Sequence, residues 1–217
     1  MQLPFSRTEF LDVFAAYNSA LWPASATLWL GSLAALVLLV ARGSLARTLS
    51  MWLAVLWAWS AIAYHAAYFS RINPAAWLFA GVFLFQAVLF VWVGVVGDRL
   101  RFSWRRTRRH LMAAALGVYA LVYPLLALAS GHEYPRTPTF GVPCPITLFT
   151  VALLLATDPP LPRALVVIPV LWCLVGGSAA VLLGVTPDLA LLVAGLALAV
   201  YAVGPSAGRS DARPMRD

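Results

Sequence analysis

The sequence predicts an all-α integral membrane protein, a bundle of seven transmembrane helices. Of the 217 residues, 62% are hydrophobic and only 11% are charged, whereas soluble domains carry about 25% charged residues. Apolar stretches recur along the whole chain, and about 20 helical residues suffice to cross a bilayer. The loops between these stretches alternate in arginine content. Almost no length remains for a soluble domain.

Seven apolar stretches are predicted to form the helices of one transmembrane domain over residues 21–205. They are Leu21–Ala41, Met51–Ser70, Ala75–Val96, Leu111–Ser130, Pro145–Thr157, Ala164–Gly184 and Leu189–Gly204. Residues 206–217 are predicted to be a disordered cytoplasmic tail.

The arginines divide unequally between the two sides of such a bundle. Twelve lie on one side: Arg42, Arg47, Arg99, Arg101, Arg105, Arg106, Arg108, Arg109, Arg163, Arg209, Arg213 and Arg216. Three lie on the other: Arg7, Arg71 and Arg136. Because cytoplasmic loops carry the excess of basic residues, the N-terminus is predicted outside and the C-terminus inside.

Residues 1–20 are predicted to form a short amphipathic helix on the outer membrane surface. The motif SRTE fits a capping box, which satisfies free N–H groups at a helix start. Phe10, Phe14 and Tyr17 then recur at helical spacing. Such a helix serves either as a simple interfacial anchor or as a lid over an outer pocket.

Several kinds of chemistry are excluded or disfavoured. All 15 basic residues are arginine, so the chain cannot form a retinal or pyridoxal Schiff base or a phosphate loop with its lysine. No C-x-x-C or H-E-x-x-H motif occurs, and we expect neither a cofactor nor a metal. The basic run "RLRFSWRRTRRH" of the Arg99–Arg109 loop is expected to contact anionic lipids, not nucleic acid.

The fifth stretch begins unusually, with Cys144 between Pro143 and Pro145 in "FGVPCP". Pro145 is predicted to be the first helical residue. The stretch that follows has only 13 residues, about 20 Å of helix, against a hydrocarbon core of about 30 Å. "TFGVPC" is therefore expected to enter the membrane as irregular backbone. Such backbone is tolerated only inside protein or beside a wet cavity.

Polar residues near the outer side are predicted to line a pocket. "YHAAYF" places Tyr64 and Tyr68 on one helix face with a histidine beside it, and ionisable residues inside spans are often functional. "GHEYP" precedes the cysteine segment, and a glutamine lies near the middle of the third span. The candidate ligand-binding residues are Tyr64, His65, Tyr68, Asn73, Gln86, His132, Glu133 and Cys144.

Each signal also has a purely structural interpretation. His65 can be hydrogen-bonded to a neighbouring helix, since polar side chains hold membrane helices together. The stretches Asn73–Pro74 and Thr186–Pro187–Asp188, each a cap residue followed by proline, are typical helix starts. Cys173 is expected to pack as a small apolar residue. The ligand types of the pocket would suit copper or zinc, but their spacing matches no metal motif.

The order of spans allows a 3+1+3 parallel repeat, in which spans one to three correspond to spans five to seven. "VLWAWSAIAYHAAYFSRINPAAWLFAGV" aligns with "VLWCLVGGSAAVLLGVTPDLALLVAGL" at its VLW start and near its proline. Parallel repeats of this kind occur in transporters.

The stretches "LWPASATLWL", "AYHAAYFSRINPAAWLF" and "FGVPCPITLFT" resemble a family of small bacterial polytopic membrane proteins that is catalogued as a domain of unknown function. The resemblance covers nearly the whole chain. It implies a bacterial inner-membrane location and no particular mechanism.

These observations favour small-solute or ion transport or permeation through an outward-facing polar pocket. His65 and Glu133 could exchange a proton there, because histidine titrates near neutral pH. One alternative is a membrane-bound enzyme or redox component that uses Cys144 and His65. Another is a non-catalytic membrane subunit or sensor.

Overall fold

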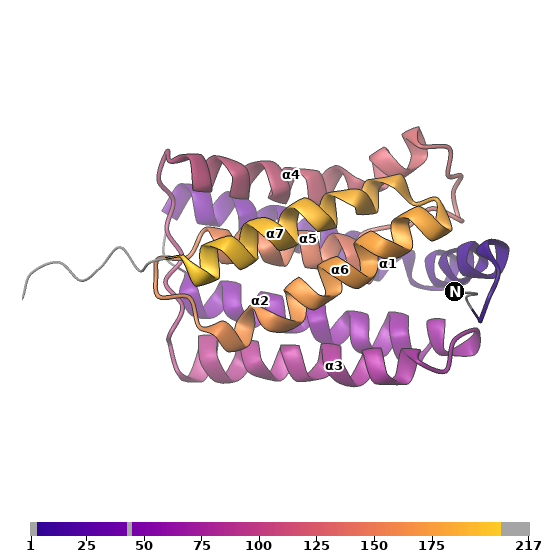
Figure 1. The fold of residues 1–217 in the computed structure, drawn as a ribbon, viewed down its shortest axis with the longest axis horizontal. Coiled ribbons are helices and arrows are strands. Elements are labelled where there is room, and N and C mark those ends of the chain that lie inside the picture. The colour runs from indigo at the N-terminus through magenta and orange to yellow at the C-terminus, as the bar shows by residue number, and fades with distance from the viewer. Residues whose placement is uncertain (1–3, 43–44, 205–217) are drawn as a thin grey trace, which may run out of the picture.

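The computed structural model describes residues 4–42 and 45–204, which form seven α-helices and no β-strand (Figure 1). The helices are α1 (Arg7–Arg42), α2 (Ala46–Trp59), α3 (Ala76–Leu89), α4 (Arg108–Ala129), α5 (Pro143–Leu155), α6 (Val167–Leu183) and α7 (Ala190–Val203). The predicted all-α fold is thereby confirmed, and the described residues form seven helices; that all seven cross the membrane stays a prediction. The predicted tail, 206–217, lies outside the described residues.

Six helical stretches are long and apolar enough to cross a membrane. Four of the α-helices, α2, α3, α6 and α7, reach that length through other helical turns. The π-helical turns η1 (Ser60–Ala66) and η3 (Phe90–Val96) continue α2 and α3. The 3₁₀ turns are η2 (Phe69–Arg71) after η1, η4 (Arg163–Leu165) before α6 and η5 (Thr186–Leu189) before α7.

Helix α5 is the exception, with 13 residues. It lies in the middle of the bundle (Figure 1) and contacts α2, α4, α6 and α7. Every residue of α5 is buried except the partly exposed Cys144. A helix that is apolar on all sides has to be buried on all sides, which explains why this short helix is central. It begins at Pro143, two residues before the predicted start, so Cys144 lies in its first turn.

The segment before α5 has irregular backbone inside the protein, as the sequence predicted. Phe140, Gly141 and Val142 are buried. Gly141 has φ +111°, and a Cβ there would lie 2.5 Å from the Tyr17 hydroxyl. Only glycine combines this backbone conformation with so close an approach.

Asn18 of α1 holds the α4–α5 connection in place. Its Nδ2 donates to the carbonyl oxygens of Pro135 and Thr137, both at 2.7 Å. Its Oδ1 accepts from the hydroxyl of Thr139 at 2.6 Å. The amide thus satisfies two carbonyls of a segment that has few backbone partners of its own.

The N-terminal residues differ from the predicted separate interfacial helix, because α1 runs from Arg7 to Arg42 with Pro23 inside it. The capping box is present: Glu9 Oε2 accepts from the Ser6 N–H at 2.7 Å. A single proline removes one hydrogen bond, and adding a turn to an existing helix is easier than starting a new one. The aromatic face packs on η1 and η2, with Phe14 stacked on Tyr64.

Most described arginines lie at one end of the bundle, which we call the arginine end. They include Arg47, Arg99, Arg101, Arg105, Arg106, Arg108, Arg109 and Arg163. In Figure 1 this end is on the left, where α7 ends. The opposite end, here the cavity end, holds the start of α1 and the α2–α3, α4–α5 and α6–α7 connections.

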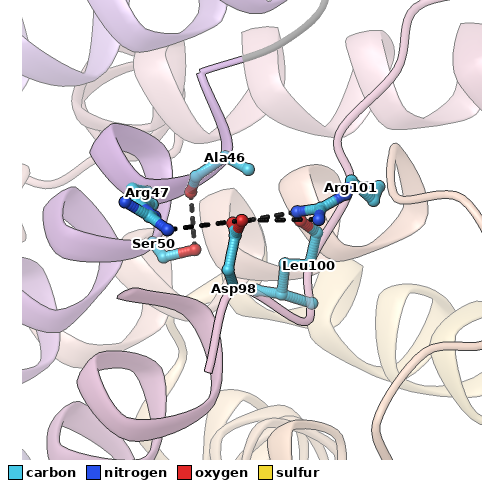
Figure 2. Close-up of polar contacts among 6 residues, drawn as sticks. All are labelled: Ala46, Arg47, Ser50, Asp98, Leu100 and Arg101. Carbon is cyan, nitrogen blue, oxygen red and sulfur yellow. Dashed lines mark hydrogen bonds and ion pairs between the residues drawn. The ribbon is translucent and has the colours of Figure 1, made fainter. Parts of the chain in front are cut away.

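Asp98 links two arginines at the arginine end, and Figure 2 shows their side chains approaching its carboxylate. The shortest N–O distances are 3.5 Å from Arg47 and 2.9 Å from Arg101. Asp98 has φ +47°, a left-handed conformation that Asp and Asn tolerate. The hydrogen bond from Arg101 lowers the pKa of the Asp98 carboxyl. Orientation in the membrane and the internal repeat stay predictions.

Candidate functional site

A cavity of about 360 Å³ lies at the cavity end, between the start of α1, η1, η2, α5, α6 and η5. Its wall is mainly aromatic and aliphatic, which differs from the predicted polar pocket. The aromatic side chains other than tyrosine are Phe5, Phe10, Phe14, Phe69, Phe79 and Trp172. Three of these rings come from the N-terminal segment, so that segment forms part of the cavity wall.

The π-helical turn η1 places Tyr64 and His65 in this wall. A π turn adds a residue to each helical turn, and such turns often occur at functional sites. Tyr64 stacks between aromatic rings of Phe14 and Phe69, with centroid distances of 5.9 and 5.7 Å. The turn is therefore fixed by aromatic packing on both sides.

His65 is fully buried, and neither ring nitrogen has a hydrogen-bond partner in the described residues. Aromatic rings surround it, with centroid distances of 4.7 Å to Phe83 and 5.2 Å to Trp172. The alternative interpretation, in which His65 is hydrogen-bonded to a neighbouring helix, is therefore not found in the described residues. Buried polar atoms are nearly always satisfied, so unpartnered nitrogens beside a cavity indicate a place where a ligand or water binds.

Asp188 supplies a carboxyl to the same cavity. It lies in η5, is buried, and accepts a hydrogen bond from the Tyr123 hydroxyl of α4. The neighbouring Pro187 carbonyl accepts from the Tyr119 hydroxyl at 2.9 Å. Two tyrosines on one face of α4 thus fix the position of η5. Cys144, in the first turn of α5, also lines the cavity.

Four of the eight predicted site residues line this cavity: Tyr64, His65, Asn73 and Cys144. The Asn73 Oδ1 also accepts from the Ala75 N–H at 3.1 Å. This bond is the helix-start role that its sequence predicted, and it is compatible with a position in the wall.

The other four predicted residues lie elsewhere. Gln86 is buried and donates to the Leu165 carbonyl at 3.3 Å. Tyr68 lies beneath the Arg71 guanidinium, 4.9 Å from its ring centroid. His132 is buried, with Nδ1 3.2 Å from the Ala127 carbonyl, whereas Glu133 is exposed. The convergence of His132 and Glu133 on Cys144 is therefore not found.

Three cavity residues with polar side-chain atoms were not among the predicted site residues: Tyr123, Trp172 and Asp188. In the sequence, Asp188 fits the pattern of a helix start, so it was not selected as a candidate site residue. An acidic residue next to a predicted span and a tyrosine inside another were the only available signals. Their pairing required contact between α4 and η5, which are 65 residues apart in the Tyr123–Asp188 hydrogen bond.

No group of three or more His, Cys, Asp or Glu side chains that could hold a metal occurs within residues 4–42 and 45–204. Both cysteines are free. The cavity therefore offers single polar groups in an apolar wall. Such an arrangement can bind a small molecule and orient its polar part.

A second cavity, of about 590 Å³, lies at the arginine end and is lined in part by Arg109, Arg163 and Tyr201. The Arg109 guanidinium lies 4.6 Å from the Tyr201 ring centroid and donates to the Thr157 carbonyl at 2.5 Å. Its side chain is thus held in one place beside the cavity.

Comparison with known proteins agrees with the resemblance seen in the sequence. The model of DUF6064, a family of unknown function, matches residues 7–209. No curated protein and no solved structure is significantly similar to the chain. Because the match covers nearly the whole chain, this protein belongs to DUF6064, a family of unknown function.

Proposed function

We propose that this membrane-spanning helical protein binds a small solute in the cavity at the cavity end and mediates its transport or permeation. The observation that carries the proposal is His65, buried in the cavity wall with two ring nitrogens that have no partner among residues 4–42 and 45–204. The volume of about 360 Å³ falls in the range of small-molecule sites. A cavity needed only for packing would be expected to be filled or lined without such groups.

The membrane setting of this proposal follows from the charges. The positive-inside rule puts the arginine end in the cytoplasm and the cavity end outside. The family resemblance supports a bacterial inner membrane. Arg109 and Arg163 beside the arginine-end cavity support the proposal that anionic lipid headgroups bind near the Arg99–Arg109 loop.

The N-terminal segment acts as a lid in this proposal. Phe5, Phe10 and Phe14 line the cavity, and Phe10 packs edge-to-face on Phe14 with centroids 4.9 Å apart. Movement of this segment would open the cavity without disturbing the central helix.

A block of the cavity tests the proposal. Ala179 of α6 lines it, whereas the adjacent Ser178 is exposed. Ala179→Trp should fill the cavity, and Ser178→Trp is the matched control with the same added bulk. The assay measures how far neopentylbenzene slows alkylation of Cys144 by N-ethylmaleimide in nanodiscs, in a Cys173→Ser background.

Neopentylbenzene should slow alkylation in the parent protein and in Ser178→Trp, and have no effect in Ala179→Trp. An alkylation rate of the parent protein that does not change at saturating probe would contradict solute binding in this cavity. Equal protection in both tryptophan variants would place the bound probe elsewhere.

A second candidate, a membrane-bound enzyme, is favoured by one observation: Cys144 and His65 line the same cavity. The variant Cys144→Ala separates the two functions. A solute-binding protein should keep its probe affinity, because alanine retains an apolar wall. An enzyme that uses the thiol as nucleophile should lose all turnover.

A further inference from the structure

The cavity has one acidic side chain among the described residues that line it, Asp188, and it has no arginine. Asp188 is 6% exposed and forms no ion pair within the described residues. Its described side-chain hydrogen-bond donor is the Tyr123 hydroxyl. An ionised carboxyl in such a place is costly unless a positive charge accompanies it.

The ionisable groups that face Asp188 do not supply that charge, and His65, which lines the same cavity, forms no ion pair with it in the described residues. Tyr64 faces it from η1, Tyr119 and Tyr123 from α4, and Cys144 from α5. Phenols and thiols are neutral or negative, never positive. Arg7 lies beside the nearby Gly184: its Nη2 is 3.0 Å from the position that a Cβ on Gly184 would occupy. Arg7 makes no ion pair with Asp188 in the described residues.

Two ways remain to offset the cost of this carboxyl: it holds a proton, or it pairs with a cation that enters the cavity. The rest of the wall favours a particular kind of cation. Aromatic faces attract positive charge, and Phe79 and Trp172 form an edge-to-face pair with centroids 5.4 Å apart. The same rings accept an apolar body.

We propose that the cavity binds a small organic cation, an ammonium group on an apolar body, and that protons compete with this cation for Asp188. The ammonium lies at the Asp188 carboxylate, and the apolar body lies against the rings of the N-terminal segment and α6. This inference rests on the proposed solute binding and names the class of solute.

A matched pair of probes tests it. Benzyltrimethylammonium and neopentylbenzene have the same shape, but only the first carries a charge. Their dissociation constants are measured by calorimetry on the whole protein in nanodiscs from pH 5 to pH 8.5. The cation should bind about tenfold more tightly than the neutral probe at the highest pH. This preference should weaken as the pH is lowered, because protons then compete with the cation for Asp188.

The variant Asp188→Asn should abolish the preference and its pH dependence. Asp158→Asn is the matched control, because Asp158 lies at the arginine end, where its Oδ1 accepts a hydrogen bond from the Ser103 hydroxyl at 2.8 Å. It should behave like the parent protein. A pH dependence that persists in Asp188→Asn would belong to another group, such as His65, and would overturn the competition for Asp188.

The outcomes separate the two proposals. If neither probe binds, solute binding in this cavity fails and the cation proposal fails with it. If both probes bind equally at high pH, solute binding stands and the cation proposal is overturned. The parent protein decides between these results by itself, even if Asp188→Asn does not fold.

Discussion

The two ends of the bundle treat an aspartate in opposite ways. At the arginine end, Asp98 is partly exposed and has two arginines beside its carboxylate. At the cavity end, Asp188 is buried, has no arginine partner among the described residues, and accepts a hydrogen bond from a phenol. Charge is neutralised by protein groups at the first end. At the second end, we propose that a proton or a ligand neutralises it.

The same contrast extends to the backbone. The connections at the arginine end are tied by exposed ion pairs, which contribute little to stability individually. The α4–α5 connection at the cavity end is held by the buried amide of Asn18 and by a glycine that touches Tyr17. Substitutions at the cavity end should therefore lower the free energy of unfolding much more than substitutions at the arginine end.

The two cysteines give the sharpest contrast, between a cavity residue and a core residue. Cys144 lines the cavity and is partly exposed, whereas Cys173 is fully buried in α6. A membrane-impermeant thiol reagent on intact cells should label Cys144 in a Cys173→Ser background. It should leave Cys173 unlabelled in Cys144→Ser.

This labelling also tests orientation, because it requires the cavity end to be outside. Labelling of Cys144 only after the membrane is dissolved would contradict the predicted orientation or the access of the cavity to solvent. A permeant reagent on the same cells distinguishes these two explanations, because it reaches an open cavity from either side.

Gly141→Ala should cause the largest loss of stability. The new Cβ would lie 2.5 Å from the Tyr17 hydroxyl, at a backbone φ of +111°. Strain and overpacking together should lower the free energy of unfolding by about 3 kcal/mol. Gly131→Ala is the matched control, since Gly131 has φ +89° and no atom within 4 Å of the new Cβ.

In the control variant Gly131→Ala, the free energy of unfolding should fall by only about 1 kcal/mol, the cost of placing alanine in a left-handed conformation. Both free energies come from denaturant unfolding in detergent micelles. Equal losses in the two variants would show that the contact with Tyr17 is not tight.

Asn18→Ala should be less severe. It removes the donor to the Pro135 and Thr137 carbonyls and the acceptor for the Thr139 hydroxyl. Leaving these groups without partners in a buried place should cost about 2 kcal/mol. The exposed neighbour provides the control, Ser19→Ala, which should be neutral. A neutral Asn18→Ala would mean that the connection is held by its apolar contacts alone.

Asp98→Asn should have the smallest effect, because its ion pairs are exposed and screened by salt. Asparagine tolerates the positive φ, so only the charge changes. Because the folded-state pKa of Asp98 is lowered, its contribution is present above the unfolded pKa of the carboxyl. It is lost as the pH falls through the folded-state value.

The small stability difference between the parent protein and Asp98→Asn should therefore vanish in acid and at high salt. Thermal unfolding from pH 2 to pH 7, with and without added salt, measures it. A difference that persists at low pH would show that hydrogen-bond geometry, not charge, stabilises this connection.

The sequence alone determined the composition-driven features of this protein. Seven helices follow from apolar runs, because backbone groups in lipid must be satisfied within the segment. The short fifth helix and the buried irregular segment before it follow from counting residues against the membrane thickness. Tyr64, His65, Asn73 and Cys144 were found because polar residues are rare in such runs.

Only the tertiary structure decided which polar residues meet. Sequence spacing places residues on a face of one helix, but contact between helices depends on packing around α5. That packing brings Asp188 to Tyr123 and His65 to Trp172, and it leaves His132 and Glu133 outside the cavity. It also joins the predicted surface helix to the first span, with the aromatic face of that helix packed against η1 and η2.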